Sequence, residues 1–95
     1  MNYALFGKFT SKPEDRDKLA SILLEASLLL AGNPDCFRYE ISTSEEAGTV
    51  WVSELWKNKA AHDASLEPEE VRNLIMKAKP LITGMEKIAE MDVLE

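Results

Sequence analysis

Residues 3–10 carry large apolar side chains on both faces of a strand, and this constrains the fold more than any other feature of the sequence. The segment is too short for an isolated helix and is rich in aromatic and aliphatic residues, which favours a β-strand. Side-chain alternation places Phe6 on one face and Leu5 and Phe9 on the other. A strand that is apolar on both sides must be covered on both sides.

Apolar spacing predicts the remaining elements. Leu19, Ile22, Leu23, Ala26, Leu29 and Leu30 recur with helical spacing. Ser11 and Glu14 have capping-box spacing at the start of that helix, and Gly32 can end it in a left-handed conformation. In chain order we expect a helix over 11–32, strands over 36–44 and 49–56, a short helix over 58–66 capped by Asn58, a helix over 68–80 and a strand over 85–94.

This order of elements predicts a single α+β domain over residues 1–95, with the ferredoxin-like βαββαβ arrangement and an antiparallel sheet. Helices cover only one face of such a sheet. We therefore predict a homodimer in which a second copy packs on the other sheet face. The two faces are grouped as Leu5, Phe9, Trp51 and Leu55 against Phe6, Val50, Val52 and Trp56, and the sequence does not say which group faces the helices.

Composition excludes several classes of function. Seventeen Asp and Glu against 11 Lys and Arg give a net charge of −6, which opposes binding to nucleic acid. One cysteine, Cys36, and one histidine, His62, cannot form an intrachain disulfide or a zinc cluster of thiolates and imidazoles. The chain shows neither a secretory signal nor an apolar run long enough to cross a membrane, so we expect a cytoplasmic protein.

Three stretches together resemble the antibiotic biosynthesis monooxygenase family, which includes quinol monooxygenases. Lys12-Pro13 follows the first strand, and residues 33–40 read Asn-Pro-Asp-Cys-Phe-Arg-Tyr-Glu, with Asp35 where the family usually has glycine. Glu54-Leu55-Trp56 is followed by Ala60, Ala61 and His62. The resemblance implies a dimeric α+β barrel that oxidises electron-rich aromatics of the quinol or anthrone type with dioxygen, without metal, flavin or other cofactor.

The spacing of three residues supports a site for such chemistry. Glu54 and Trp56 are two apart in a strand and point to one face, and His62 lies about one turn into the next helix. An apolar cavity with an imidazole and a carboxylate can bind a flat aromatic and remove a phenolic or enolic proton. We predict His62 as the base, Glu54 as the group that orients it or a water, and Trp56, Phe6 and Tyr39 as the aromatic wall.

Other interpretations of these residues stay open. His62 can be an exposed or capping residue, Glu54 can form an ion pair with Lys8 or an arginine, and Trp56 can be core packing. The alternative functions are a small-molecule isomerase or lyase on the same fold and a non-catalytic dimeric ligand-binding protein. Haem degradation is rejected unless His62 substitutes as the axial ligand, because Phe6 and Leu66 stand where the haem-degrading relatives have asparagine and histidine.

Overall fold

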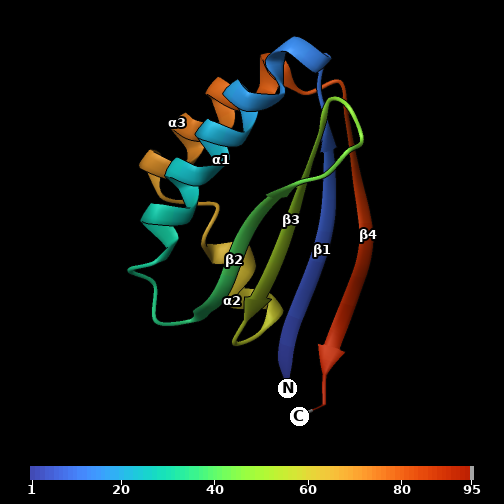
Figure 1. The fold of residues 1–95 in the computed structure, drawn as a ribbon. Coiled ribbons are helices and arrows are strands. Elements are labelled where there is room, and N and C mark those ends of the chain that lie inside the picture. Colours follow the sequence, from blue (N-terminus) through green and yellow to red (C-terminus); the bar gives the residue numbers. More distant parts are fainter. Residues whose placement is uncertain (95) are drawn as a thin grey trace.

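The protein forms one four-stranded antiparallel sheet with all of its helices on one face (Figure 1), as the ferredoxin-like prediction required. The computed structural model describes residues 1–94, and no helix among them is long and apolar enough to cross a membrane. The strands lie in the order β2-β3-β1-β4. The elements are β1 (Asn2–Thr10), η1 (Pro13–Asp15), α1 (Arg16–Leu30), β2 (Cys36–Thr43), β3 (Thr49–Trp56), α2 (Lys59–Ala64), α3 (Glu69–Ala78), η2 (Lys79–Leu81) and β4 (Gly84–Val93).

The register between β1 and β3 decides which side chains face the helices. Leu5 pairs with Glu54, and Phe6 pairs with Ser53. Residues directly opposite each other in an antiparallel pair point to the same face of the sheet. Leu5 therefore faces the helices with Glu54, whereas Phe6 lies on the outer face. The predicted grouping of Phe6 with Val50, Val52 and Trp56 is wrong, because alternation within one strand does not fix its register against the next.

The core lies between the inner sheet face and helices α1 and α3. One cluster joins Leu19 and Leu23 of α1 to Val50 and Val52 of β3 and Ala78 of α3. A second cluster, formed by Tyr3, Leu30 and Trp56, closes the end of the sheet near α2. Both clusters fix the position of β3, and with it the strand residues Glu54 and Trp56.

Two predicted details of α1 are wrong at its ends. No side chain caps its start; the Ser11 hydroxyl instead donates a hydrogen bond to the Lys12 carbonyl at 2.8 Å. The helix ends at Ala31 in ordinary helical geometry, and Gly48 in the β2–β3 hairpin is the glycine with a positive φ, 64°. Leu29, a predicted core residue, is 40% exposed because it lies at the edge of the buried face of α1, which Leu19, Leu23, Ala26 and Leu30 form.

Leucines on opposite faces of α1 provide a test of this packing. Leu19 is fully buried and Leu28 is 76% exposed. We expect Leu19→Ala to lower the free energy of unfolding by about 2–5 kcal/mol, because it removes buried methyl groups and leaves a cavity. Leu28→Ala on the same helix should change it by less than about 0.5 kcal/mol. Urea unfolding of both variants measures the difference, and equal losses would contradict the observed orientation of α1.

Candidate functional site

Helix α2 brings the only histidine back over the sheet. β3 ends at Trp56, and the Asn58 side chain accepts a hydrogen bond from the Ala61 amide at 2.8 Å, which starts a helix two residues after the strand. This confirms the predicted Asn58 cap. Because the helix begins so close to the strand, the His62 ring lies beside Trp56, with ring centroids 5.6 Å apart in an edge-on arrangement.

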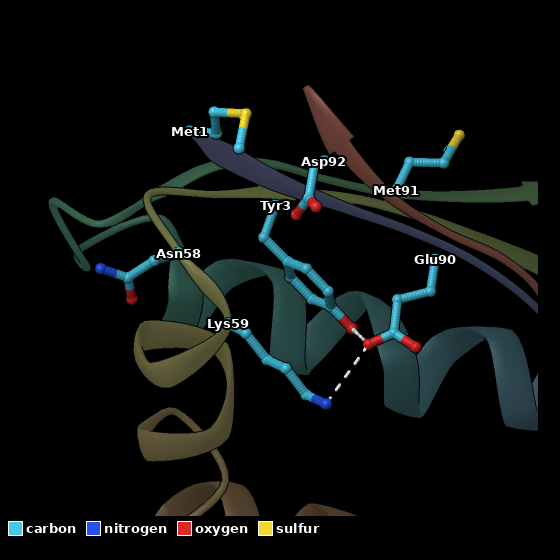
Figure 2. Close-up of a pocket in the computed structure, with 7 residues that line it drawn as sticks. All are labelled: Met1, Tyr3, Asn58, Lys59, Glu90, Met91 and Asp92. Carbon is cyan, nitrogen blue, oxygen red and sulfur yellow. Dashed lines mark hydrogen bonds and ion pairs between the residues drawn. The ribbon is translucent and has the colours of Figure 1, made fainter. Parts of the chain in front are cut away.

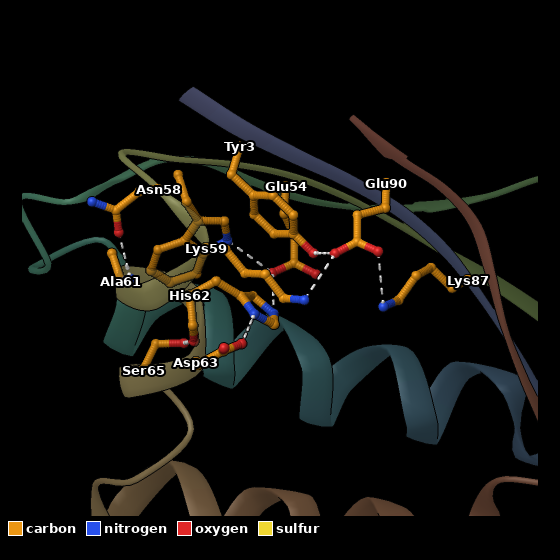
Figure 3. A network of polar contacts seen from close by, with 11 residues as sticks. Tyr3, Glu54, Asn58, Lys59, Ala61, His62, Asp63, Ser65, Lys87 and Glu90 are labelled. Carbon is orange, nitrogen blue, oxygen red and sulfur yellow. Dashed lines mark hydrogen bonds and ion pairs between the residues drawn. The ribbon is translucent and has the colours of Figure 1, made fainter. Parts of the chain in front are cut away.

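His62, Glu54 and Trp56 form the centre of a polar network (Figure 3). The Trp56 indole N–H donates to Glu54 Oε1 at 3.0 Å, and His62 Nε2 lies 3.7 Å from the same oxygen. The side chains of Glu54 and His62 are only 11% and 16% exposed. The structure thus brings together the three residues that spacing predicted on one face.

Burial is the main influence on the Glu54 carboxyl. Desolvation raises the pKa of Glu54, because a charged carboxylate is disfavoured away from water, and the hydrogen bond from Trp56 and the charge of protonated His62 oppose the shift. A buried carboxyl with a raised pKa beside an imidazole is an arrangement typical of functional sites.

Tyr3 packs against the imidazole and belongs to a second group of polar contacts around Glu90. The Tyr3 ring centroid lies 5.7 Å from that of His62. Figure 2 shows the Tyr3 hydroxyl donating to Glu90 Oε1, at 2.8 Å, while Lys59 Nζ approaches the same oxygen at 3.5 Å. These residues line a shallow hollow of about 400 Å³ near the end of β4. Burial and the bond to Glu90 raise the pKa of Tyr3, and the same bond lowers the pKa of Glu90.

The polar pair opens onto a larger cavity of about 610 Å³ between the sheet and the helices. Most of its lining is aliphatic and comes from α1, α3 and the inner face of β1. Glu54, His62 and Tyr39 contribute polar atoms to it, and Lys79 and Lys87 are among the charged residues of its lining. A cavity of this size is typical of small-molecule sites, which range from about 300 to 1,000 Å³.

The predicted aromatic wall is only partly assembled. Tyr39 lines the cavity, and burial followed by the charge of Glu54 raises its pKa. Trp56 is fully buried behind Glu54. Phe6 lies on the opposite sheet face, where it stacks on Trp51 with ring centroids 5.5 Å apart. Its predicted place in the wall is therefore wrong, and Leu5 lines the cavity instead.

The positions of Glu54 and Lys8 rule out the alternative in which these two residues form an ion pair. Lys8, one predicted partner, lies on the outer face and pairs with Glu46 at 2.9 Å. Glu54 instead faces Trp56 and His62.

Tyr3 and Asp63 lie beside His62 but were not among the site residues predicted from the sequence. Tyr3 and Leu5 are two residues apart in β1 and so point to the same face of the strand. Only the strand register shows that Glu54 also points to this face. Asp63 follows His62 directly in the chain, and its Oδ1 lies 3.0 Å from His62 Nδ1. Within residues 1–94, no group of three or more His, Cys, Asp or Glu side chains is placed to hold a metal ion.

The fold and the cavity define a small α+β domain in which a carboxyl and an imidazole border a largely apolar cavity. The model of the antibiotic biosynthesis monooxygenase (ABM) family matches residues 2–76, and the chain belongs to this family. No curated protein matches the chain.

Solved structures agree with this assignment. A candidate antibiotic biosynthesis monooxygenase from Chloroflexus aurantiacus J-10-fl is 28% identical, with a TM-score of 0.89 over 100% of this chain and 95% of that one. Candidate family members from Caulobacter crescentus CB15 and Deinococcus radiodurans are 18% and 21% identical, with TM-scores of 0.87 and 0.84. They cover 99% and 100% of this chain, and 91% and 94% of their own lengths are matched. At these identities the last two show the fold alone.

Two carboxyls with opposite pKa shifts predict opposite effects of pH on stability. The pKa of Glu54 is raised, so its contribution is most favourable below the unfolded value of 4.5 and is lost as pH rises through the folded pKa. The pKa of Glu90 is lowered, so its contribution is present above 4.5 and is lost as pH falls through the folded pKa.

We therefore expect Glu54→Gln to raise the melting temperature relative to the wild type as pH increases from about 4 to 8. Glu90→Gln should lower the melting temperature at neutral pH, and the loss should shrink on acidification. Thermal unfolding followed by circular dichroism across this range measures both trends. The same pH trend in the two variants would contradict the contrasting environments of Glu54 and Glu90.

Proposed function

We propose that the protein is a cofactor-independent monooxygenase that inserts one oxygen atom of O2 into an electron-rich aromatic of the quinol or anthrone type. One observation carries the proposal: His62 Nε2 and the buried carboxyl of Glu54 lie together on a largely apolar cavity of about 610 Å³. Family membership supports the same class of reaction.

The first step is removal of a proton from the bound substrate. His62 Nε2 accepts a phenolic or enolic proton, and the substrate becomes an electron-rich anion. Glu54, 3.7 Å from Nε2, stabilises the imidazolium that forms. The aliphatic lining excludes water, and so keeps the anion reactive toward oxygen rather than toward solvent protons.

The anion then reacts with dioxygen directly. It transfers electrons to O2, a carbon–oxygen bond forms, and the resulting peroxide takes back the proton held by His62. The remaining hydrogen of that carbon leaves as a proton while the O–O bond breaks, and the departing hydroxide takes up this proton and leaves as water. A carbonyl remains on the substrate carbon. In total, the substrate carbon, which is a CH2 in the keto form of the phenol or enol, reacts with O2 to give C=O and H2O, and His62 returns to its starting state.

Removal of the base provides the main test. We expect His62→Ala to lower oxygen uptake with hydroquinones, naphthoquinols or anthrones by about 100-fold or more, because general-base catalysis supplies about that factor. The melting temperature should stay within a few degrees of the wild-type value, because His62 lines the cavity and belongs to neither core cluster. Wild-type activity should also survive dialysis against a chelator. Unchanged turnover in His62→Ala would remove His62 from the mechanism.

An isomerase or lyase is the second candidate, because the pairing of a raised-pKa carboxyl with an imidazole also serves proton shuttling without oxygen. Turnover under strictly anaerobic conditions separates the two. Product formation at an unchanged rate without O2 favours the isomerase. The third alternative is a non-catalytic binding protein, for which a pocket too small for an aromatic ring would be the sign. The cavity has room for such a ring, so this sign is absent.

We further propose that the protein forms a homodimer through the outer face of the sheet. Phe6 and Trp51 stack there at an interplanar angle of 6°, and Ala89 and Met91 of β4 share this face through the register with β1. All helices lie on the opposite face (Figure 1). A second copy, related by a two-fold axis, presents the same apolar surface and covers these side chains in both subunits.

A charge introduced at this face tests the dimer. Trp51→Glu should shift the protein to monomers in sedimentation velocity at micromolar concentration, because two carboxylates would be buried without partners at the interface. Leu28→Glu, on the exposed face of α1, is the matched control and should leave the dimer intact. A dimer that persists in Trp51→Glu would refute this interface.

A further inference from the structure

Asp63 lies outside the cavity lining but contacts the residue that we propose as the base. Its Oδ1 is 3.0 Å from His62 Nδ1, while Nε2 of the same ring is directed toward Glu54 (Figure 3). We propose that Asp63 is a positioning residue that holds the neutral imidazole in the tautomer with its proton on Nδ1. The Nε2 lone pair then faces Glu54 and the cavity.

Hydrogen-bond chemistry supports this tautomer. A carboxylate can only accept hydrogen bonds, so a contact of 3.0 Å with Asp63 places the proton on Nδ1. In a neutral imidazole the hydrogen bond of one ring nitrogen determines the state of the other. Nε2 is then free of a proton and can accept one, as a base on the cavity side must.

The surroundings hold the ring in the orientation that this requires. Tyr3 packs against the His62 ring at 5.7 Å and Trp56 at 5.6 Å, so tilting the ring out of its plane would break aromatic contacts. Glu54 Oε1 accepts a hydrogen bond from the Trp56 indole N–H and lies 3.7 Å from His62 Nε2, which is longer than a hydrogen bond. The Tyr3 hydroxyl donates to Glu90 and so does not compete for either imidazole nitrogen. Asp63 is therefore the hydrogen-bonding partner of the imidazole at Nδ1.

The two carboxyls beside His62 differ in exposure. The Asp63 side chain is 61% exposed, whereas that of Glu54 is 11% exposed. Water solvates the Asp63 charge without cost, while burial disfavours the ionised form of Glu54. The exposed carboxylate of Asp63 therefore accepts the hydrogen bond from Nδ1–H. Nε2, on the cavity side of the ring, can still take up a proton.

The catalytic part of this inference rests on the proposed function, but the tautomer can be measured without any substrate. His62 is the only histidine in the chain, so its two ring nitrogens give unambiguous ¹⁵N NMR signals. Spectra recorded at increasing pH, until the two ¹⁵N shifts no longer change, report the neutral tautomers. We expect the wild type to show protonated Nδ1 and unprotonated Nε2.

Asp63→Ala removes the acceptor and should shift the population toward protonated Nε2. Asp63→Asn keeps an oxygen acceptor at the same position and should retain more of the Nδ1–H form. Asp17→Ala is the matched control, since Asp17 is an exposed carboxylate that contacts only the neighbouring Arg16 among the ion pairs of residues 1–94. A tautomer ratio in Asp63→Ala equal to that of the wild type would overturn the inference, whatever the activity.

Kinetics tests the catalytic consequence. We expect Asp63→Ala to lower kcat for the quinol or anthrone substrate about tenfold with little change in KM, and Asp63→Asn to recover part of the loss. Loss of an orienting partner commonly costs about 10- to 100-fold where histidine ligates a metal, and the exposure of Asp63 favours the lower end here. An unchanged kcat alongside a shifted tautomer would refute the positioning role. Absence of oxygen uptake by the wild type would refute the proposed function, while the NMR result would still decide whether Asp63 sets the tautomer.

Discussion

The antiparallel register between β1 and β3 is the constraint on which the site depends. Pairing of Leu5 with Glu54 directs that carboxyl toward the helices, where α2 returns His62 over it. A shift of one residue would turn Glu54 to the outer face and bring Ser53 inward. The register is itself held by burial, because Val50 and Val52 must face α1 and α3 to complete the core. The packing that stabilises the domain thus also fixes the acid–base pair.

Two features of the inner face, a buried carboxyl and a cavity, lower the stability of the folded domain, and a domain with only a structural role would avoid them. Glu54 is an ionisable group placed at an aliphatic cavity, and its raised pKa reflects the unfavourable removal of its charge from water. The cavity also reduces packing in a small domain whose core is limited by its size. Gly7, which has no side chain, lies among the cavity residues on the strand between Leu5 and Phe9. Unfilled space and a buried carboxyl together are typical of a binding site rather than of a core.

The sequence predicted the order, type and approximate bounds of the elements because their apolar periods differ clearly between strand and helix. It also placed Glu54, Trp56 and His62 together, since two-residue spacing and a short strand-to-helix connection are local features. Phe6 was misplaced for a non-local reason: its face relative to β3 depends on register. Leu29 was misplaced because α1 is apolar around most of its circumference, so spacing alone does not select its buried side.

The two faces of the sheet carry different kinds of side chains, in line with the proposed dimer on one face and the proposed site on the other. The outer face gathers its aromatic side chains in the Phe6–Trp51 stack, with Lys8 Nζ 5.3 Å from the Trp51 ring centroid. The inner face places its ionisable groups around one imidazole. Because neighbouring residues of β3 alternate between these faces, Leu55 lies outward while Glu54 and Trp56 point inward. In the proposed dimer, a second copy on the outer face would therefore pack against the strand that carries Glu54 and Trp56 without entering the cavity, and one chain would supply all the polar groups of the proposed site.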